Sequence, residues 1–265
     1  MNSPTIYSHD DPVLQLDSIS VRYRVLREPV TSIKEYALRW LRSKNSYADF
    51  WALKNISLSI QPGEAVGIIG ANGAGKSTLL KIIARVLRPT DGRVRVRGVV
   101  APILTLGAGF DPEMTGRENI YLNGAMLGFS RSDMNKKMAS LLEFSGLGDF
   151  IDVPIRTYSD GMVARLAFAI ATDVKSDLLL IDEILTVGDI NFQEKCKIRI
   201  NTYKETGTTI LVVSHNLKTV EELCDRVIWL EHGVIRAEGK AADVIAAYED
   251  EREQPIIGNI QVTHA

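Results

Sequence analysis

Residues 70–77 have the composition and spacing of a phosphate-binding loop. They run Gly-Ala-Asn-Gly-Ala-Gly-Lys-Ser, which fits the pattern G-x-x-x-x-G-K-[ST], between the apolar run 65–69 and a helical pattern at 77–86. Glycines let backbone N–H groups approach an anion at the start of a helix, where the dipole favours negative charge. The sequence therefore predicts a nucleotide site. Its expected contacts are Gly70, Asn72, Gly73, Ala74, Gly75, Lys76, Ser77 and Thr78.

The acidic end of a later apolar run would make this site catalytic. Residues 178–181 are all apolar and are followed by Asp182 and Glu183. The charge of Lys76 would reach the β- and γ-phosphates, while Ser77 and Asp182 would hold Mg²⁺. Glu183 would then orient or deprotonate an attacking water. A strand end with two solvated acids is the alternative, and the phosphate-binding loop favours the catalytic interpretation.

His215 follows a second apolar run, 209–213. A lone histidine at the end of a strand is more often structural than functional. Ligands bind at the carboxyl ends of the strands in open α/β sheets, however, and His215 has that position. We therefore expect His215 to donate a hydrogen bond to the γ-phosphate.

The composition limits the class of protein. The chain has 265 residues, 45% of them hydrophobic, which allows one domain with two lobes. Its net charge of −2 gives no indication of a nucleic-acid partner. Cys196 and Cys224 form neither a metal-binding spacing nor a disulfide framework, which favours a reducing cytosol. No run of 18 apolar residues is present, and residues 1–11 lack the apolar core of a secretory signal, so a membrane role would require a partner.

Short apolar runs alternate with helical patterns along the chain, which predicts an α/β fold with a mostly parallel sheet. Strands are expected at 13–16, 56–60, 65–69, 178–181, 209–213 and 226–230, with a hairpin turn at His232 and Gly233. Helices at 116–127, 130–144 and 162–172 predict a helical lobe inserted at about 109–173. The expected units are a tail at 1–12, a domain at 13–248 with an insertion at 25–50, and a tail or linker at 249–265.

Two segments fall outside this scheme. Residues 31–42 place apolar side chains on one helical face and basic side chains elsewhere. They form either a short helix packed on its own domain or a basic amphipathic segment near lipid headgroups or a membrane partner. The charged residues 249–253 are expected at a solvated end, and residues 254–265 are expected to be disordered or to begin a linker.

A second anion-binding helix start lies within residues 157–169. Ser159 is a suitable N-cap, and Gly161 falls in the first turn of the expected helix. With this element the chain resembles the ATP-binding-cassette (ABC) ATPases over about residues 13–248. The motifs come in the order of that family: phosphate-binding loop, Ser-x-Gly signature, acidic strand end, Asp189 and then His215.

This resemblance implies a fold, a cofactor and an assembly. It implies a P-loop NTPase cassette with a mostly parallel core sheet, an antiparallel β subdomain and an inserted helical subdomain that binds ATP and Mg²⁺. The signature would contact the γ-phosphate of ATP held by the opposite subunit of a homodimer, and Asp189 would lie at the subunit seam. The signature residues are Ser159, Asp160, Gly161 and Met162.

One branch of the family is similar to this chain at residues 106–120, 158–162 and 184–189. It comprises the ATPases of bacterial exporters of O-antigen, capsule and teichoic acid, which are lipid-linked glycan polymers. The similarity implies a homodimer that works with two copies of a polytopic permease, as a peripheral subunit on the cytoplasmic face of the cytoplasmic membrane. Residues 111–127 are then expected to face the permease. A soluble ABC ATPase without a transport role is the alternative, and a nucleotide kinase is a rival outside the family.

The chain departs from the family pattern in its coupling loop and its signature. It has no glutamine between Gln61 and Gln193, so the residue that couples the site to the permease is left open. Asp160 stands where a glycine is usual, and its side chain is expected to point away from the phosphate. Met162 stands where a glutamine is usual.

The aromatic side chain that stacks on adenine is left open among three residues. In the family it follows the first strand, and Tyr23 has that position. Because the insertion at 25–50 begins there, Tyr47 or Trp51 could serve instead.

Overall fold

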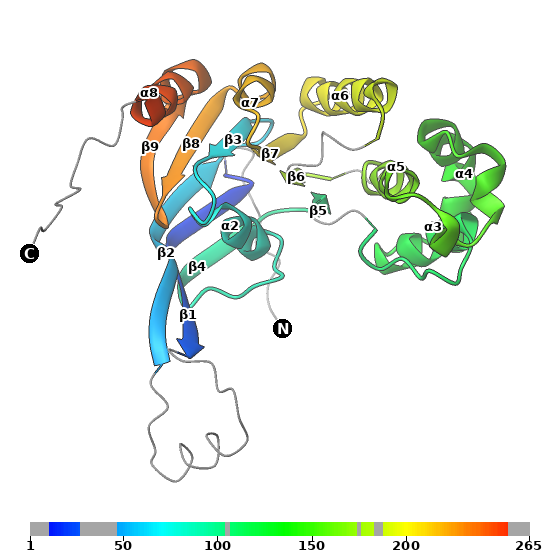
Figure 1. Ribbon diagram of the computed structural model, residues 1–265, viewed down its shortest axis with the longest axis horizontal. Helices are drawn as coiled ribbons and strands as arrows, with labels where there is room; N and C mark the ends of the chain where they lie inside the picture. Colours follow the sequence, from blue (N-terminus) through cyan, green and yellow to red (C-terminus); the bar gives the residue numbers. More distant parts are fainter. Residues whose placement is uncertain (1–10, 27–46, 104–106, 174–175, 183–187, 254–265) are drawn as a thin grey trace, which may run out of the picture.

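The protein folds around two β-sheets, with a lobe of helices beside them (Figure 1). The computed structural model describes residues 11–26, 47–103, 107–173, 176–182 and 188–253. One sheet has six strands and the other has three. Within these ranges, no helix has both the length and the apolar character needed to cross a lipid bilayer.

The six-stranded sheet has the order β5-β6-β7-β3-β8-β9. Neighbouring strands are parallel except β8 and β9, which form an antiparallel hairpin. Every residue of β3 and β7 is buried, because both faces of this part of the sheet are covered. The strands are β3 (Ala65–Ile69), β5 (Val100–Ile103), β6 (Leu178–Asp182), β7 (Thr209–Val213), β8 (Arg226–Glu231) and β9 (Val234–Lys240).

Different elements cover the two faces of this sheet. On one face, α2 and the three-stranded sheet pack against side chains such as Ile68 and Leu180. On the other face, α6, α7 and α8 pack against side chains such as Ile181 and Val212. The bounds are α2 (Lys76–Ile83), α6 (Ile190–Glu205), α7 (Leu217–Leu223) and α8 (Ala241–Glu253). Helix α2 is shorter than the expected 77–86 because Arg85 adopts a left-handed conformation with φ 60°.

The three-stranded sheet is antiparallel, with the order β2-β1-β4. Its strands are β1 (Leu14–Leu26), β2 (Tyr47–Ile60) and β4 (Asp91–Val96). Leu14 and Leu16 are buried, whereas Gln15 and Asp17, which alternate with them along the strand, are partly exposed, as expected for a sheet with one face on the core. The long hairpin of β1 and β2 projects away from the body of the protein (Figure 1).

The helical lobe has a hydrophobic core of its own, which includes Ile120, Leu141 and Leu166. It contains α3 (Gly116–Met126), α4 (Arg131–Ser145) and α5 (Asp160–Ala171), with short 3₁₀ turns at Gly148–Asp152 and Ile155–Thr157. Thr115 and Ser130 begin α3 and α4 with capping boxes, so the first backbone N–H groups of both helices are satisfied locally.

The fold class is the one expected from the sequence, but several element bounds differ. The strands expected at 13–16 and 56–60 are much longer, so residues 25–26 and 47–50 of the expected insertion belong to β1 and β2. Helix α8 continues to Glu253, so the charged residues 249–253 are helical, and residues 249–252 are exposed. The expected helix at 31–42 and the segments 1–10 and 254–265 lie outside the described residues.

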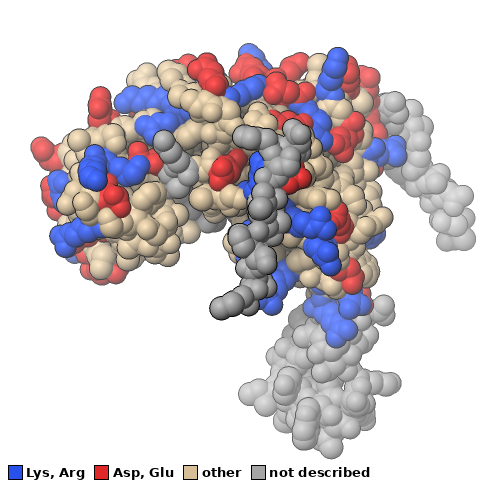
Figure 2. All heavy atoms as spheres, turned by 180° about the vertical axis from the view of Figure 1, so that it is seen from behind, with Lys and Arg blue, Asp and Glu red and all other residues tan. Residues whose placement is uncertain are grey.

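On the face seen in Figure 2, acidic and basic side chains are interspersed over the described part of the chain. This distribution agrees with the net charge of −2. It differs from the basic stripe that is typical of a nucleic-acid interface.

Candidate active site

The phosphate-binding loop joins the buried strand β3 to α2, as the sequence predicts. Gly70 has φ 146°, and a Cβ there would lie 2.2 Å from the carbonyl oxygen of Leu230. Gly75 has φ 108°, and a Cβ there would lie 2.7 Å from the carbonyl oxygen of Ala52. Both positions therefore require glycine, because a side chain would be strained and would also collide with backbone.

Lys76 is the first residue of α2 and is buried. Its ammonium group donates hydrogen bonds to the carbonyl oxygens of Gly70, at 2.7 Å, and Ala71, at 3.0 Å. These bonds hold the positive charge against the loop whose backbone N–H groups would receive a phosphate. The burial costs less than that of an unpaired charge because the ammonium is hydrogen-bonded.

A pocket of about 350 Å³ lies over this loop and reaches the β1–β2 hairpin. Tyr23, one of the three residues considered for adenine stacking, lines this pocket, and so does Phe50, which the sequence analysis missed. These two residues are directly opposite each other in the antiparallel register. The lining of this pocket consists of Tyr23, Phe50, Ala52, Asn72, Gly73, Gly75, Lys76, Ser77, Thr78 and His215.

The structure places Trp51 elsewhere. Trp51 is not among the described residues that line the pocket. It follows Phe50 on β2 and pairs with Arg22, whose guanidinium lies 5.5 Å from the centre of the indole ring. Adjacent strand residues point to opposite faces, so Phe50 and Trp51 cannot both face the pocket. The side chain of Tyr47 lies outside the described residues.

The strand register brings the predicted acidic residue and the histidine to the same edge as the loop. Asp182 pairs with Val213 across β6 and β7, and Ile68 of β3 pairs with the same Val213. The carboxyl ends of all three strands therefore meet where the phosphate-binding loop begins. His215 follows β7 by two residues and lines the pocket. Glu183 follows Asp182 directly but lies outside the described residues.

A second pocket, of about 590 Å³, lies on another side of the same loop. His215 and residues 71–74 line it together with the β8–β9 turn and α8. In α8, the ring of Tyr248 packs edge-on against Trp229 at 5.2 Å between ring centres. The sequence analysis missed this pocket, because it treated α8 only as the end of the domain.

The predicted signature forms the start of α5. Ser159 is its N-cap and accepts a hydrogen bond from the backbone N–H of Met162 at 3.3 Å. Asp160 is exposed in the first turn. A Cβ on Gly161 would meet Ser159 Oγ at 3.9 Å, which is an ordinary contact, so packing within this chain does not require glycine at this position.

Asp189 is the N-cap of α6 and accepts a hydrogen bond from the backbone N–H of Phe192 at 2.9 Å. This hydrogen bond lowers the pKa of the Asp189 carboxyl below its usual value, and the charge of Arg165 lowers it further. Arg165 lies on α5, with Nη1 at 3.9 Å from Asp189 Oδ2. The signature helix and the helix that begins at Asp189 are thus neighbours.

The signature and the phosphate-binding loop are separate within one chain. Helix α5 lies in the helical lobe, away from α2 (Figure 1). None of residues 159–162 lines the pocket over the loop. The two predicted anion-binding elements therefore do not share a pocket within one chain.

An apolar groove of about 510 Å³ lies between the central sheet and the helical lobe. Its wall includes the exposed side chains of Val86, Val99 and Met126, which are 71%, 52% and 67% exposed. Gly107, Ala108 and Phe110 of the glycine-rich stretch line the same groove. Asn123, Met126 and Leu127 of the segment 111–127, which is predicted to face a permease, also line this groove.

The described motifs agree with a known family. The model of the family described as "ABC transporter" matches residues 53–186. This chain belongs to the ABC transporter ATP-binding family. The family predicted from the motif order is thereby confirmed.

Relatives in this family are similar over most of the chain. The O-antigen export system ATP-binding protein RfbB of Klebsiella pneumoniae is 44% identical over 90% of this chain and 98% of its own length. The protein with the same description from Myxococcus xanthus is 46% identical over 91% of this chain, and the chain spans 56% of its length. The teichoic acids export ATP-binding protein TagH of Lactococcus lactis is 43% identical over 89% of this chain, which spans 50% of its length.

Solved ABC structures share the fold. A dimeric ATP-binding cassette in a post-hydrolysis state with ADP and Pi matches 86% of this chain and 98% of its own, with a TM-score of 0.69 and 24% identity. The ATP-binding subunit of an ABC transporter matches 89% of this chain and 93% of its own, with a TM-score of 0.71 and 23% identity. At these identities the match establishes the fold.

Proposed function

We propose that this chain is the ATP-hydrolysing subunit of an ABC transporter that exports a lipid-linked polysaccharide across the bacterial cytoplasmic membrane. The observation that carries the ATPase function is the phosphate-binding loop, with its two glycines in left-handed conformations and the buried Lys76. The names of the relatives, which concern O-antigen and teichoic acid export, support this class of cargo.

The residues at the sheet edge have different roles in ATP hydrolysis. Lys76 and the loop N–H groups bind the β- and γ-phosphates, and the Ser77 hydroxyl and Asp182 carboxylate are oxygen donors of the kind that Mg²⁺ prefers. Bound there, Mg²⁺ would neutralise charge on the phosphate oxygens. Glu183 orients and deprotonates the attacking water, and His215 donates a hydrogen bond to the γ-phosphate. Tyr23 and Phe50 stack on the adenine.

A homodimer would complete each ATP site. In one chain Ser159 and Gly161 do not line the pocket over the phosphate-binding loop. Packing within the chain leaves room for a side chain at Gly161, so its small size favours the approach of a group from outside, such as the partner's bound phosphate. Each ATP would then supply contacts between subunits that ADP lacks, and hydrolysis would bias the dimer towards opening.

The apolar groove is the proposed docking site for the permease. Exposed aliphatic side chains are normal when scattered, but here Val86, Val99 and Met126 gather in one hollow. A cytoplasmic helix of a polytopic permease would cover them, with one permease copy on each ATPase subunit. This places the subunit as a peripheral protein on the cytoplasmic face of the membrane.

The experiment combines ATPase assays with affinity purification from bacterial membranes. We expect Glu183→Gln to bind ATP with almost no turnover, and Met126→Glu to retain ATPase activity but lose the co-purifying permease. Ile198→Glu is the matched control, because Ile198 is 59% exposed on α6 and outside the groove. Wild-type turnover in Glu183→Gln would refute the catalytic assignment. Purification with ribosomes or DNA and no polytopic protein would favour a soluble ABC ATPase.

A further inference from the structure

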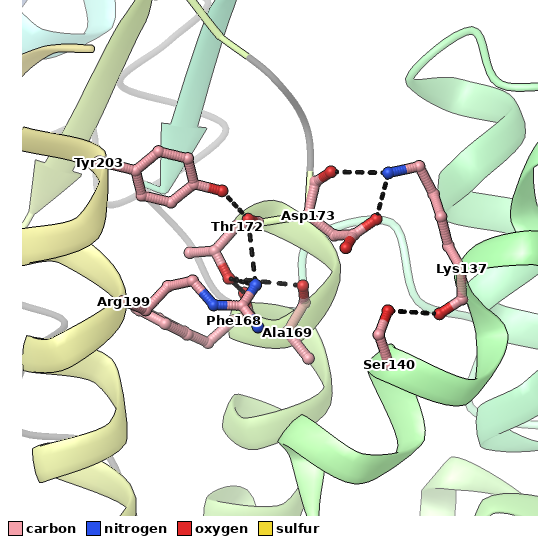
Figure 3. Close-up of polar contacts among 8 residues, drawn as sticks. All are labelled: Lys137, Ser140, Phe168, Ala169, Thr172, Asp173, Arg199 and Tyr203. Carbon is pink, nitrogen blue, oxygen red and sulfur yellow. Dashed lines mark hydrogen bonds and ion pairs between the residues drawn. The ribbon is translucent and has the colours of Figure 1, made fainter. Parts of the chain in front are cut away.

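The C-terminal end of the signature helix is fastened to α6 by two side chains. Thr172 follows the last residue of α5, and its carbonyl oxygen accepts a hydrogen bond from Arg199 Nη1 at 3.3 Å and another from the Tyr203 hydroxyl (Figure 3). Carbonyl groups at the end of a helix have no partner within the helix, and a positive charge there interacts favourably with the helix dipole. Arg199 supplies both a donor and this charge.

Helix α4 joins the same point. Lys137 of α4 pairs with Asp173, its Nζ lying 2.5 Å from the carboxylate and 2.9 Å from the carbonyl oxygen (Figure 3). Arg199 also lies over the ring of Phe144 of α4, at 4.1 Å from the ring centre. The end of α5 is therefore held by cations from both neighbouring helices.

Contacts along the rest of α5 join it to α6 as well. Phe168 in the middle of α5 packs edge-on against Phe192 of α6, with ring centres 6.1 Å apart. About one turn before Phe168 on α5, Arg165 lies 5.8 Å from the centre of the Phe192 ring and pairs with Asp189. Helices α5 and α6 are thus in contact at three positions along α5: Arg165, Phe168 and Thr172. Ser159 is the N-cap of α5, and Asp189 is the N-cap of α6.

We propose that Arg199 and Tyr203 are positioning residues for the signature. They hold α5 on α6 so that Ser159 and Asp189 approach the partner's ATP as one rigid unit. This inference rests on the proposed two-subunit site. Both residues act from the far end of the helix, and neither lines the pocket over the phosphate-binding loop.

Because α5 is long, a small tilt at its C-terminal end displaces the signature at its N-terminal end. Its 12 residues span about 18 Å, so a tilt of about 3° at Thr172 would move Ser159 by about 1 Å. A displacement of that size at a reacting centre can lower the rate by about 100-fold. Loss of a single fastening side chain would produce a part of this effect, since the contacts of Phe168 and Arg165 remain.

The experiment compares Arg199→Ala and Tyr203→Phe with Lys204→Ala. Lys204 is the control because it is also partly buried on α6 but bonds to Leu223 and Asp225, away from α5. Three quantities are measured for each variant: affinity for a fluorescent ATP analogue in the monomer, kcat of ATP hydrolysis, and ATP-driven dimerisation in a Glu183→Gln background. Tyr203→Phe removes one oxygen atom and keeps the ring, so it serves if Arg199→Ala does not fold.

We expect Arg199→Ala to lower kcat by about tenfold and Tyr203→Phe by a few-fold, with affinity in the monomer unchanged within twofold. Both variants should weaken ATP-driven dimerisation, and Lys204→Ala should change neither kcat nor dimerisation. Equal kcat in Tyr203→Phe, Lys204→Ala and the wild type would overturn the inference. So would a parallel loss of affinity in the monomer, which would indicate general damage to the fold. If Ser159→Ala itself retains full activity, the two-subunit site fails, and with it the proposed function on which this inference rests.

Discussion

Replacing Phe50 and its neighbour Trp51 tests which face of the β1–β2 hairpin receives the adenine. Phe50 is 56% exposed and Tyr23 is 39% exposed; they are cross-strand partners, and both line the pocket over the phosphate-binding loop. Trp51 is covered by Arg22 and is not among the described residues of that pocket. We expect Phe50→Ala to weaken ATP binding and Trp51→Ala to leave it unchanged.

The size of the effect follows from the exposure of the two rings. Stacking of a base on an aromatic side chain is worth about 1–3 kcal/mol. Tyr23 and Phe50 would share one adenine at an open site, so the lower end applies to each of them. About 1 kcal/mol corresponds to an increase in Kd of about fivefold. Trp51→Ala instead removes a cation–π contact worth about 0.5–1 kcal/mol, and this loss falls on the free energy of unfolding.

The assay is a titration of each purified variant with ATP by calorimetry, in parallel with thermal unfolding. Tyr23→Ala should match Phe50→Ala in Kd, and Phe50→Tyr should bind as the wild type does because the ring is kept. An increase in Kd for Trp51→Ala as large as that for Phe50→Ala would refute the assignment of the two faces. It would mean that the hairpin register in solution differs by one residue.

Two further predictions concern titratable groups. Hydrogen bonds from Thr115 and Ser130 lower the pKa of Glu118 and of Asp133, so the contribution of these two carboxylates to stability is present above the ordinary carboxyl pKa and is lost as pH falls through the lowered values. On acidification, helix content should therefore fall in α3 and α4 first, which hydrogen exchange can check. Earlier loss of structure from the central sheet would contradict this prediction. Burial raises the pKa of Cys196 and Cys224 to about 12, so neither should react with iodoacetamide at about pH 8 until the protein unfolds, as mass spectrometry would show.

The sequence was sufficient wherever one segment carries its own signal. Strands β3, β6, β7 and β8 are each built on a short apolar run, and each forms within one residue of its predicted bounds. The phosphate-binding loop was equally clear, because its glycines are required by conformations that other residues avoid. Ser159 was recognised as an N-cap for a similar local reason.

Features that depend on pairing between distant segments could not be predicted from the sequence. Phe50 lines the pocket because it pairs with Tyr23 across a hairpin whose strands are joined by residues 27–46. Both strands extend well beyond the apolar runs at 13–16 and 56–60, so those runs do not reveal this pairing. Strand β4 alternates arginine with valine, so it lacks the continuous apolar run that identified the central strands.

Helix α6 was missed although its spacing was visible. Phe192, Cys196 and Ile200 are buried at intervals of four residues, but most of the helix is polar, which obscures this apolar spacing. The fastening by Arg199 and Tyr203 could not be predicted from spacing, since it requires the end of α5 to lie beside α6.

Helix α5 connects the proposed permease groove with the proposed ATP contact at Ser159, in a chain without the glutamine that usually couples these two sites. Ala167 and Ile170 of this helix line the apolar groove, and Ser159 begins the same helix. The eight residue steps from Ser159 to Ala167 span about 12 Å of helix. If the groove receives the permease and Ser159 receives the partner's phosphate, then a shift at either site must move the other, because the two share one helix. Coupling would then depend on the orientation of α5, which the contacts to α6 fix, rather than on a single side chain in the loop.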